Sequence, residues 1–189
     1  MIRAFVALPL PDDVRQRLNL LQFLLPLPRR VPPENLHLTL AFLGEQPTDL
    51  LEDAHHALEA IRAAPFALTL SGVGSFGGAE PRTVFAGVAP APALEHLQRK
   101  VATALRRAGI ALEKRRFTPH VTLARLNPER LSSLDRMRLS DALAANAGFA
   151  AGPFEVASFA LYRSHLGGEA AHYEELARYP LHGPADALP

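Results

Sequence analysis

The chain has 189 residues, of which 48% are hydrophobic, enough for one full-sized domain or for two small lobes that share a core. It contains no cysteine, which excludes disulfides, thiolate metal sites and cysteine nucleophiles and fits a reducing cytoplasm. Its 20 basic and 19 acidic residues leave a net charge of +1, so any contact with a polyanion has to be local.

The sequence predicts no membrane span and no secretory signal. The longest apolar run, residues 18–27, is interrupted by Asn19, Gln22 and Pro26 and is shorter than the ~20 residues that a membrane helix needs. At the N-terminus, MIRAFVALPLPDD has a very short apolar stretch followed directly by acidic residues. We therefore expect a cytoplasmic protein.

The first third of the chain is predicted to contain two strands and two helices. The strand segments are rich in small and branched apolar residues and are bounded by prolines, which cannot continue a ladder. The helical segments place apolar residues every three or four positions, and Thr48 is the expected N-cap of the second. The expected elements are strands over residues 2–8 and 36–44 and helices over residues 12–25 and 48–63.

The rest of the chain continues to alternate between the two kinds of element. Strands are expected over residues 66–70, 83–88, 119–126, 154–162 and 173–178, and helices over residues 93–107 and 133–146. The glycine-rich SGVGSFGG is expected to be a flexible connection between two of these strands. Because glycine- and proline-containing connections join neighbouring strands, the fold class is α/β, or α+β in the stricter sense, with mixed or antiparallel sheets.

The strand over residues 36–44 separates an apolar face from a polar one. Strict alternation puts the leucines and Phe42 on the core side and His37, Thr39 and Ala41 on the other side. His37 and Thr39 are therefore expected to share one surface.

A short internal repeat is the strongest chemical signal. His-Leu-Thr-Leu at 37–40 recurs as His-Val-Thr-Leu at 120–123, again in a predicted strand. If the fold brings these strands side by side, one imidazole can act as general base and the other as general acid, because imidazole titrates at about pH 6.5. Threonine hydroxyls can donate hydrogen bonds to phosphate oxygens, where negative charge accumulates. This layout is suited to cleaving phosphate esters.

Other residues near the repeats are candidate phosphate or base contacts. Arg125 can add a fork of donors, although strict alternation places it on the core side, so its participation requires a bend or the end of the strand. Phe76 can stack on a base, and the basic residues Arg115 and Arg116 can contact an RNA backbone. Histidine and carboxylate residues show no metal-ligand spacing, so we expect no metal and no cofactor.

Five segments lie in the order and spacing of a known family: RAFVALPLP, VPPENLHLTLAFLGE, SGVGSFGG, PRTVFAGV and FTPHVTLARL. In them the chain resembles the bacterial and archaeal RNA 2′,3′-cyclic phosphodiesterases, historically called 2′-5′ RNA ligases, of the two-histidine phosphoesterase superfamily. The resemblance covers roughly residues 1–180. It implies a single bilobal domain over residues 1–189, in which two antiparallel-sheet lobes with helices outside meet at a central cleft.

The resemblance also implies an activity and residue roles. The activity is metal-independent hydrolysis of an RNA terminal 2′,3′-cyclic phosphate to a 2′-phosphomonoester, with weak 2′-5′ RNA ligation as the reverse reaction. By position, His37 is the proton donor to the leaving 3′ oxygen, and His120 is the acceptor from water. Thr39, Thr122 and Arg125 bind phosphate. The residues alone do not distinguish the acid from the base, because the two repeats are symmetric.

Two alternatives stay open. One is a phosphodiesterase that acts on small cyclic nucleotides, and the other is a nucleotide- or RNA-binding module that uses the same surface for recognition alone. The expected partners are RNA ends or small cyclic phosphates, with no membrane contact and no protein partner implied.

Overall fold

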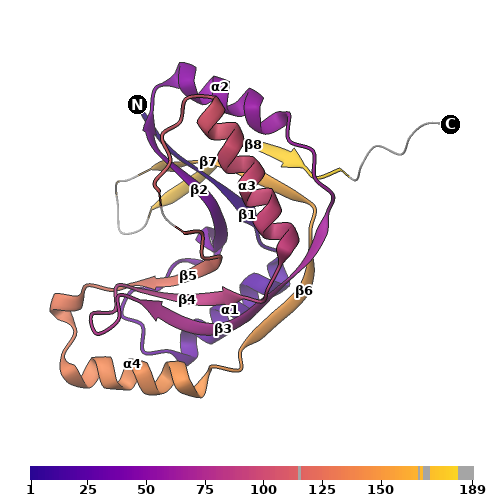
Figure 1. The fold of residues 1–189 in the computed structure, drawn as a ribbon. Coiled ribbons are helices and arrows are strands. Elements are labelled where there is room, and N and C mark those ends of the chain that lie inside the picture. The colour runs from indigo at the N-terminus through magenta and orange to yellow at the C-terminus, as the bar shows by residue number, and fades with distance from the viewer. Residues whose placement is uncertain (115, 166, 168–170, 183–189) are drawn as a thin grey trace.

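Eight strands form one sheet in the order β6-β3-β4-β5-β2-β1-β7-β8, and every neighbouring pair is antiparallel (Figure 1). The computed structural model describes residues 1–114, 116–165, 167 and 171–182. The strands are β1 (Ile2–Pro9), β2 (His37–Gln46), β3 (Phe66–Phe76), β4 (Thr83–Val88), β5 (His120–Arg125), β6 (Ala150–Val156), β7 (Ser158–His165) and β8 (His172–Pro180). The α+β class expected from the sequence is confirmed.

The sheet consists of two halves that meet where β2 lies beside β5. One half is β2-β1-β7-β8 and the other is β5-β4-β3-β6. The chain enters the first half with β1 and β2, builds the second with β3 to β6, and returns to the first with β7 and β8. Each half therefore depends on segments that are distant in sequence, and the two share one core cluster of buried residues.

Four α-helices and two short 3-10 turns complete the described part of the chain. The helices are α1 (Asp12–Leu24), α2 (Thr48–Glu59), α3 (Pro92–Arg107) and α4 (Ser133–Ala145), and the turns are η1 (Pro33–Asn35) and η2 (Pro128–Arg130). Helices α2 and α3 lie side by side against the half that contains β1 and β2, whereas α1 and α4 lie at the half that contains β3 to β6 (Figure 1). None of these helices is long and apolar enough to cross a membrane.

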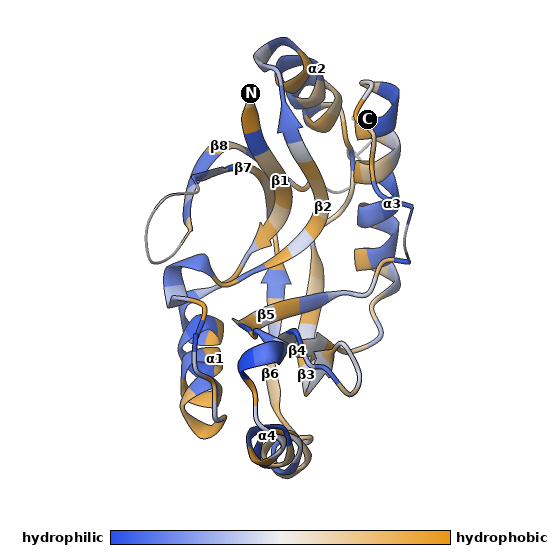
Figure 2. Cartoon of the chain, turned by 90° about the vertical axis from the view of Figure 1, so that its left-hand side faces the viewer, coloured by the Kyte–Doolittle hydropathy of each residue, from blue (hydrophilic) through white to orange (hydrophobic). Residues whose placement is uncertain are grey.

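The amphipathic pattern of α3 shows how sequence periodicity builds this core. Its residues Leu94, Leu97, Val101 and Leu105 are fully buried, and each such side chain contributes about 1.5–3 kcal/mol by leaving water. Gly109 follows the C-cap with a φ of 90°, the left-handed conformation expected of it. Figure 2 shows the resulting segregation, with apolar residues along β1 and β2 and mixed polarity around the helices.

Several sequence-based boundaries are wrong for identifiable reasons. Thr48 is the first residue of α2 rather than its cap: the N-cap is Pro47, no side chain caps the helix, and α2 ends at Glu59 instead of Ala63. The predicted strand over residues 154–162 is two strands, β6 and β7, which lie in different halves of the sheet. No glycine or proline marks the break at Ala157, so the sequence carried no turn signal there.

Most of the glycine-rich segment belongs to a strand, and only Gly77 and Gly78 lie in the connection to β4. Strand β3 continues through it to Phe76 and pairs with β4, with Gly74 opposite Phe85. A β-carbon on Gly74 would lie 3.0 Å from the ring of Phe85, so the missing side chain lets the aromatic ring lie over the strand. Glycine here therefore serves close packing, and the segment positions Phe76.

Candidate active site

The two histidine motifs meet at the join between β2 and β5. Leu38 and Val121 are directly paired across this join, and both are fully buried. Continuing the antiparallel register by one residue in each direction places His37 opposite Thr122 and Thr39 opposite the second histidine. Because side chains alternate along a strand, these four residues point away from the core side that Leu38 and Val121 occupy. The join thus gathers both motifs on one surface.

A β-bulge turns Arg125 toward that surface. Thr122 and Ala124 pair with consecutive residues of β4, which leaves Leu123 as an extra residue in β5. Leu123 and Ala124 are both buried, so the alternation is interrupted, and Arg125 is exposed. Arg125 therefore shares a face with Thr122 and His120. This bulge provides the bend that the sequence analysis required.

Strand β2 contains an equivalent bulge, so its observed faces differ from the predicted ones. Thr39 and Ala41 pair with consecutive residues of β1, and Leu40 is the extra residue. Ala41, which was expected beside the histidine, is therefore buried, whereas Phe42, which was expected in the core, is 48% exposed. Phe42 occupies the position in β2 that Arg125 occupies in β5. Sequence reasoning missed Phe42, although the doubled apolar residues after each threonine, Leu-Ala in both repeats, were a visible sign of broken alternation.

Both imidazoles are held in the same way. Nδ1 of His37 lies 2.7 Å from the main-chain oxygen of Asn35, and Nδ1 of His120 lies 2.7 Å from the main-chain oxygen of Thr118. A carbonyl oxygen can only accept a hydrogen bond, so each neutral ring carries its proton on Nδ1. Nε2 is then the basic atom of each ring, and the fixed tautomer is the one that a general base requires.

Aromatic side chains surround each histidine. The ring of His37 is stacked on Phe5 with centroids 4.8 Å apart, and Tyr173 meets it edge-on at 5.3 Å. The Phe5 ring is also 6.3 Å from the ring of Phe42, so Phe5 lies near both His37 and Phe42. These contacts restrict the rotation of His37 and exclude water from part of its surface.

His120 has a different aromatic environment. Phe76 and Phe85 both meet its ring at a steep angle, with centroids 5.0 Å and 5.6 Å away, and the two phenylalanines stack on each other at 4.2 Å. Phe76 is 36% exposed, so the predicted base contact lies beside the second motif. Arg116 is exposed and lies between α3 and β5. Arg115 lies outside the described residues.

Burial lowers the pKa of His37 to about 4. The hydrogen bond to the Asn35 carbonyl opposes this shift, whereas the positive charges of Arg125 and His120 add to it. This electrostatic influence places Arg125 and His120 close to His37, as the join between β2 and β5 requires. In the unliganded protein His37 is consequently neutral at physiological pH, and a bound anion would act on it in the opposite direction to Arg125.

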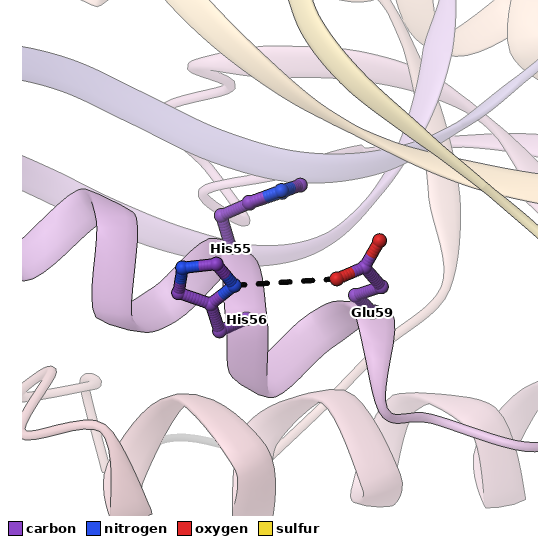
Figure 3. A group of neighbouring side chains, drawn as sticks. All are labelled: His55, His56 and Glu59. Carbon is purple, nitrogen blue, oxygen red and sulfur yellow. Dashed lines mark ion pairs between the residues drawn. The ribbon is translucent and has the colours of Figure 1, made fainter.

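A separate cluster of potential metal ligands lies on α2 (Figure 3). The ligand atoms of His55, His56 and Glu59 are within 4.8 Å of one another, although the sequence analysis expected no metal site. Nδ1 of His55 is hydrogen-bonded at 2.9 Å to the hydroxyl of Tyr179, and His56 and Glu59 form an exposed pair 4.0 Å apart. The two imidazoles lie beside each other, with ring centroids 5.3 Å apart. The cluster includes no residue of the paired motifs.

The sequence model of the 2′-5′ RNA ligase superfamily matches residues 10–168. An RNA 2′,3′-cyclic phosphodiesterase from Geobacillus stearothermophilus is 34% identical over 96% of the chain, and the chain spans 58% of that relative's length. A protein of the same name from Archaeoglobus fulgidus is 31% identical, with 93% of this chain and 98% of the relative covered. The crystal structure of Escherichia coli LigT complexed with 3′-AMP superposes with a TM-score of 0.78 at 28% identity, over 95% of this chain and 98% of LigT.

The depressed pKa of His37 makes folding stability depend on pH. Below its ordinary pKa of 6.5, the unfolded chain binds a proton that the folded protein does not bind until about pH 4. Stability is therefore fully retained above about pH 6.5 and falls by about 3 kcal/mol as the pH drops from 6.5 to 4. We expect His37→Asn, which keeps a donor for the Asn35 carbonyl, to remove this part of the loss of folding stability. Urea unfolding at about pH 7 and about pH 4.5 measures the loss.

His96→Asn serves as the control, because it removes an exposed imidazole on α3 that belongs to neither motif. If the His37 variant and the wild type lose the same stability between these two pH values, the lowered pKa of His37 is contradicted.

Proposed function

Because the chain belongs to the 2′-5′ RNA ligase superfamily, we propose that it hydrolyses terminal 2′,3′-cyclic phosphates of RNA to 2′-phosphomonoesters through His37 and His120. The observation that carries the proposal is the single join between β2 and β5, which gathers two imidazoles and two hydroxyls on one surface. The proposal treats residues 1–189 as one bilobal catalytic domain, since each half of the sheet needs strands from distant parts of the chain.

The proposed reaction needs one proton acceptor and one proton donor. A water molecule attacks phosphorus while one imidazole removes its proton, and the bond from phosphorus to the 3′ oxygen breaks while the other imidazole protonates that oxygen. Each transfer contributes roughly 10²- to 10⁴-fold. The hydroxyls of Thr39 and Thr122 and the guanidinium of Arg125 would bind the non-bridging oxygens. When the 5′ hydroxyl of another RNA end replaces water as the nucleophile, the same step forms a 2′-5′ phosphodiester, and this ligation stays minor because water is in excess.

We assign His37 as the donor and His120 as the acceptor, in line with the resemblance of the motifs. A donor must be protonated, yet the free protein holds His37 neutral because its pKa is about 4. The anionic phosphodiester removes this conflict, since a negative charge beside the ring favours the imidazolium. Substrate binding would thus protonate His37, and its ring would remain neutral until an anion binds.

The equivalent positions of Arg125 and Phe42 suggest how a nucleotide lies on this surface. Arg125 offers a cation to the phosphate, and Phe42 offers an exposed ring beside Phe5, which in turn stacks on His37. A flat apolar ring is suited to stacking on a nucleobase of any identity. Phe76, beside His120, is suited to the neighbouring base of an oligonucleotide.

Substitution of either histidine tests the chemistry. We expect His37→Asn and His120→Asn each to reduce hydrolysis of an oligonucleotide that ends in a 2′,3′-cyclic phosphate by about 10²- to 10⁴-fold, because each removes one proton transfer. His96→Asn should retain wild-type turnover. Wild-type turnover in either motif variant would reject the proposal, and tight binding of the oligonucleotide without any product would favour the binding-module alternative.

Titration of His37 tests its role as the acid. We expect its pKa, followed by NMR of the imidazole, to rise from about 4 when inorganic phosphate or 3′-AMP is bound, because the anion stabilises the imidazolium. The rise should be smaller in Arg125→Ala, which binds the anion less tightly. If the pKa of His37 stays at its unliganded value with the site saturated, His37 cannot be the donor near neutral pH, and the two roles are exchanged.

Substitution of Phe42 tests the base contact. We expect Phe42→Leu to raise KM about tenfold with little change in kcat, because loss of one stacked base costs about 1–3 kcal/mol of binding. Phe23→Leu is the matched control, because Phe23 is 63% exposed on α1. Measuring cyclic mononucleotides beside oligonucleotides also separates the substrate classes: a higher kcat/KM on mononucleotides would favour the small-substrate alternative. An unchanged KM on both would exclude Phe42 from the site.

A further inference from the structure

Two contacts connect the β7–β8 hairpin to His37, although β1 and β7 separate β8 from β2 in the sheet. The side-chain nitrogen of Asn35 donates to the main-chain oxygen of Ala171, immediately before β8, at 2.6 Å. Two residues further on, the ring of Tyr173 meets the His37 ring edge-on at 5.3 Å and 83°. The start of β8 is therefore in contact with the imidazole and with the residue that binds its Nδ1.

Asn35 makes two hydrogen bonds at once, one through its main chain and one through its side chain. Its main-chain oxygen accepts from Nδ1 of His37, and its side chain donates to Ala171. The side chain is 8% exposed, and among the described residues Asn35 and Gln22 are the polar side chains that the core buries. A buried amide that loses its partner costs about 1–3 kcal/mol, so the contact between Asn35 and Ala171 is strongly maintained.

We propose that Asn35 and Tyr173 are positioning residues for His37, which hold its imidazole in one orientation by fixing the start of β8 against it. This inference rests on the proposed function, in which the direction of Nε2 controls a proton transfer. The ring is restrained from three sides: Asn35 at Nδ1, Phe5 on one face and Tyr173 at the edge. Removing Tyr173 would leave the ring held by the Asn35 hydrogen bond and the stacked Phe5, with its edge unrestrained.

The consequence for catalysis is a matter of alignment. Proton transfer to the leaving oxygen needs Nε2 within hydrogen-bond reach and correctly directed, and a misplacement of about 1 Å can cost on the order of 10²-fold in rate. Neither Asn35 nor Tyr173 has to touch the substrate to have this effect. Their substitution should therefore lower kcat while KM changes little, and it should disturb the tautomer of His37 even in the unliganded protein.

The test compares Asn35→Leu and Tyr173→Ala with two matched controls. Asn146→Leu removes an amide at the C-cap of α4 that donates to Ala142 at 2.8 Å, and Tyr173→Phe retains the ring edge. The nitrogen NMR shifts of the His37 ring report its tautomer in the free protein. We expect one Nδ1–H tautomer in the wild type and both controls. In Asn35→Leu and Tyr173→Ala we expect mixed tautomers and a kcat on cyclic-phosphate oligonucleotides reduced about 10- to 100-fold.

The inference is overturned if the tautomer and kcat of Asn35→Leu and Tyr173→Ala match those of the controls. Tyr173→Ala changes a partly exposed residue and decides the question where Asn35→Leu fails to fold. Loss of the proposed function is distinguishable, because a wild type that does not hydrolyse the oligonucleotide still gives a tautomer comparison between variants and controls.

Discussion

One antiparallel pair, Leu38 with Val121, determines whether this surface exists. Both side chains are fully buried, so each contributes about 1.5–3 kcal/mol to holding β2 against β5. Burial of these two residues also decides which way their neighbours point, since a slip of either strand by one residue would turn the histidine of that strand into the core. The two halves of the sheet meet here through little backbone pairing. The apolar side of the join thus fixes the geometry of the polar side.

The two bulges determine which side chains face this surface farther along each strand. An inserted leucine after each threonine breaks the alternation at the same point in β2 and β5, and the next side chain out is Phe42 in one strand and Arg125 in the other. Bulges near active sites commonly redirect a side chain in this way. Equivalent backbone positions therefore carry a cation on one side of the join and an aromatic ring on the other. The two strands are alike in backbone geometry, whereas their outer side chains suit the two ends of a nucleotide, the cation the phosphate and the ring the base.

Local patterns were enough to predict most elements and both motifs. The periodicity of α3 and the alternation in β2 and β5 predicted strands and helices close to their observed bounds, because burial imposes those periods. What failed depended on contacts between distant segments. The bulge that exposes Phe42 exists only because β1 pairs with β2, and β3 runs through its glycines because Phe85 packs over Gly74. Asn35 was missed because its partner, Ala171, lies 136 residues away.

Acid-base catalysis by a repeated motif requires that equivalent groups become chemically different. The two imidazoles have the same hydrogen bond through Nδ1, so the difference must come from their surroundings. His37 is enclosed by Phe5 and by Tyr173 of the hairpin at the sheet edge. This burial lowers its pKa to about 4. His120 lies instead beside Phe76 and Phe85. The repeat therefore supplies matching geometry, and the unrelated elements packed around each copy supply different surroundings for the two rings.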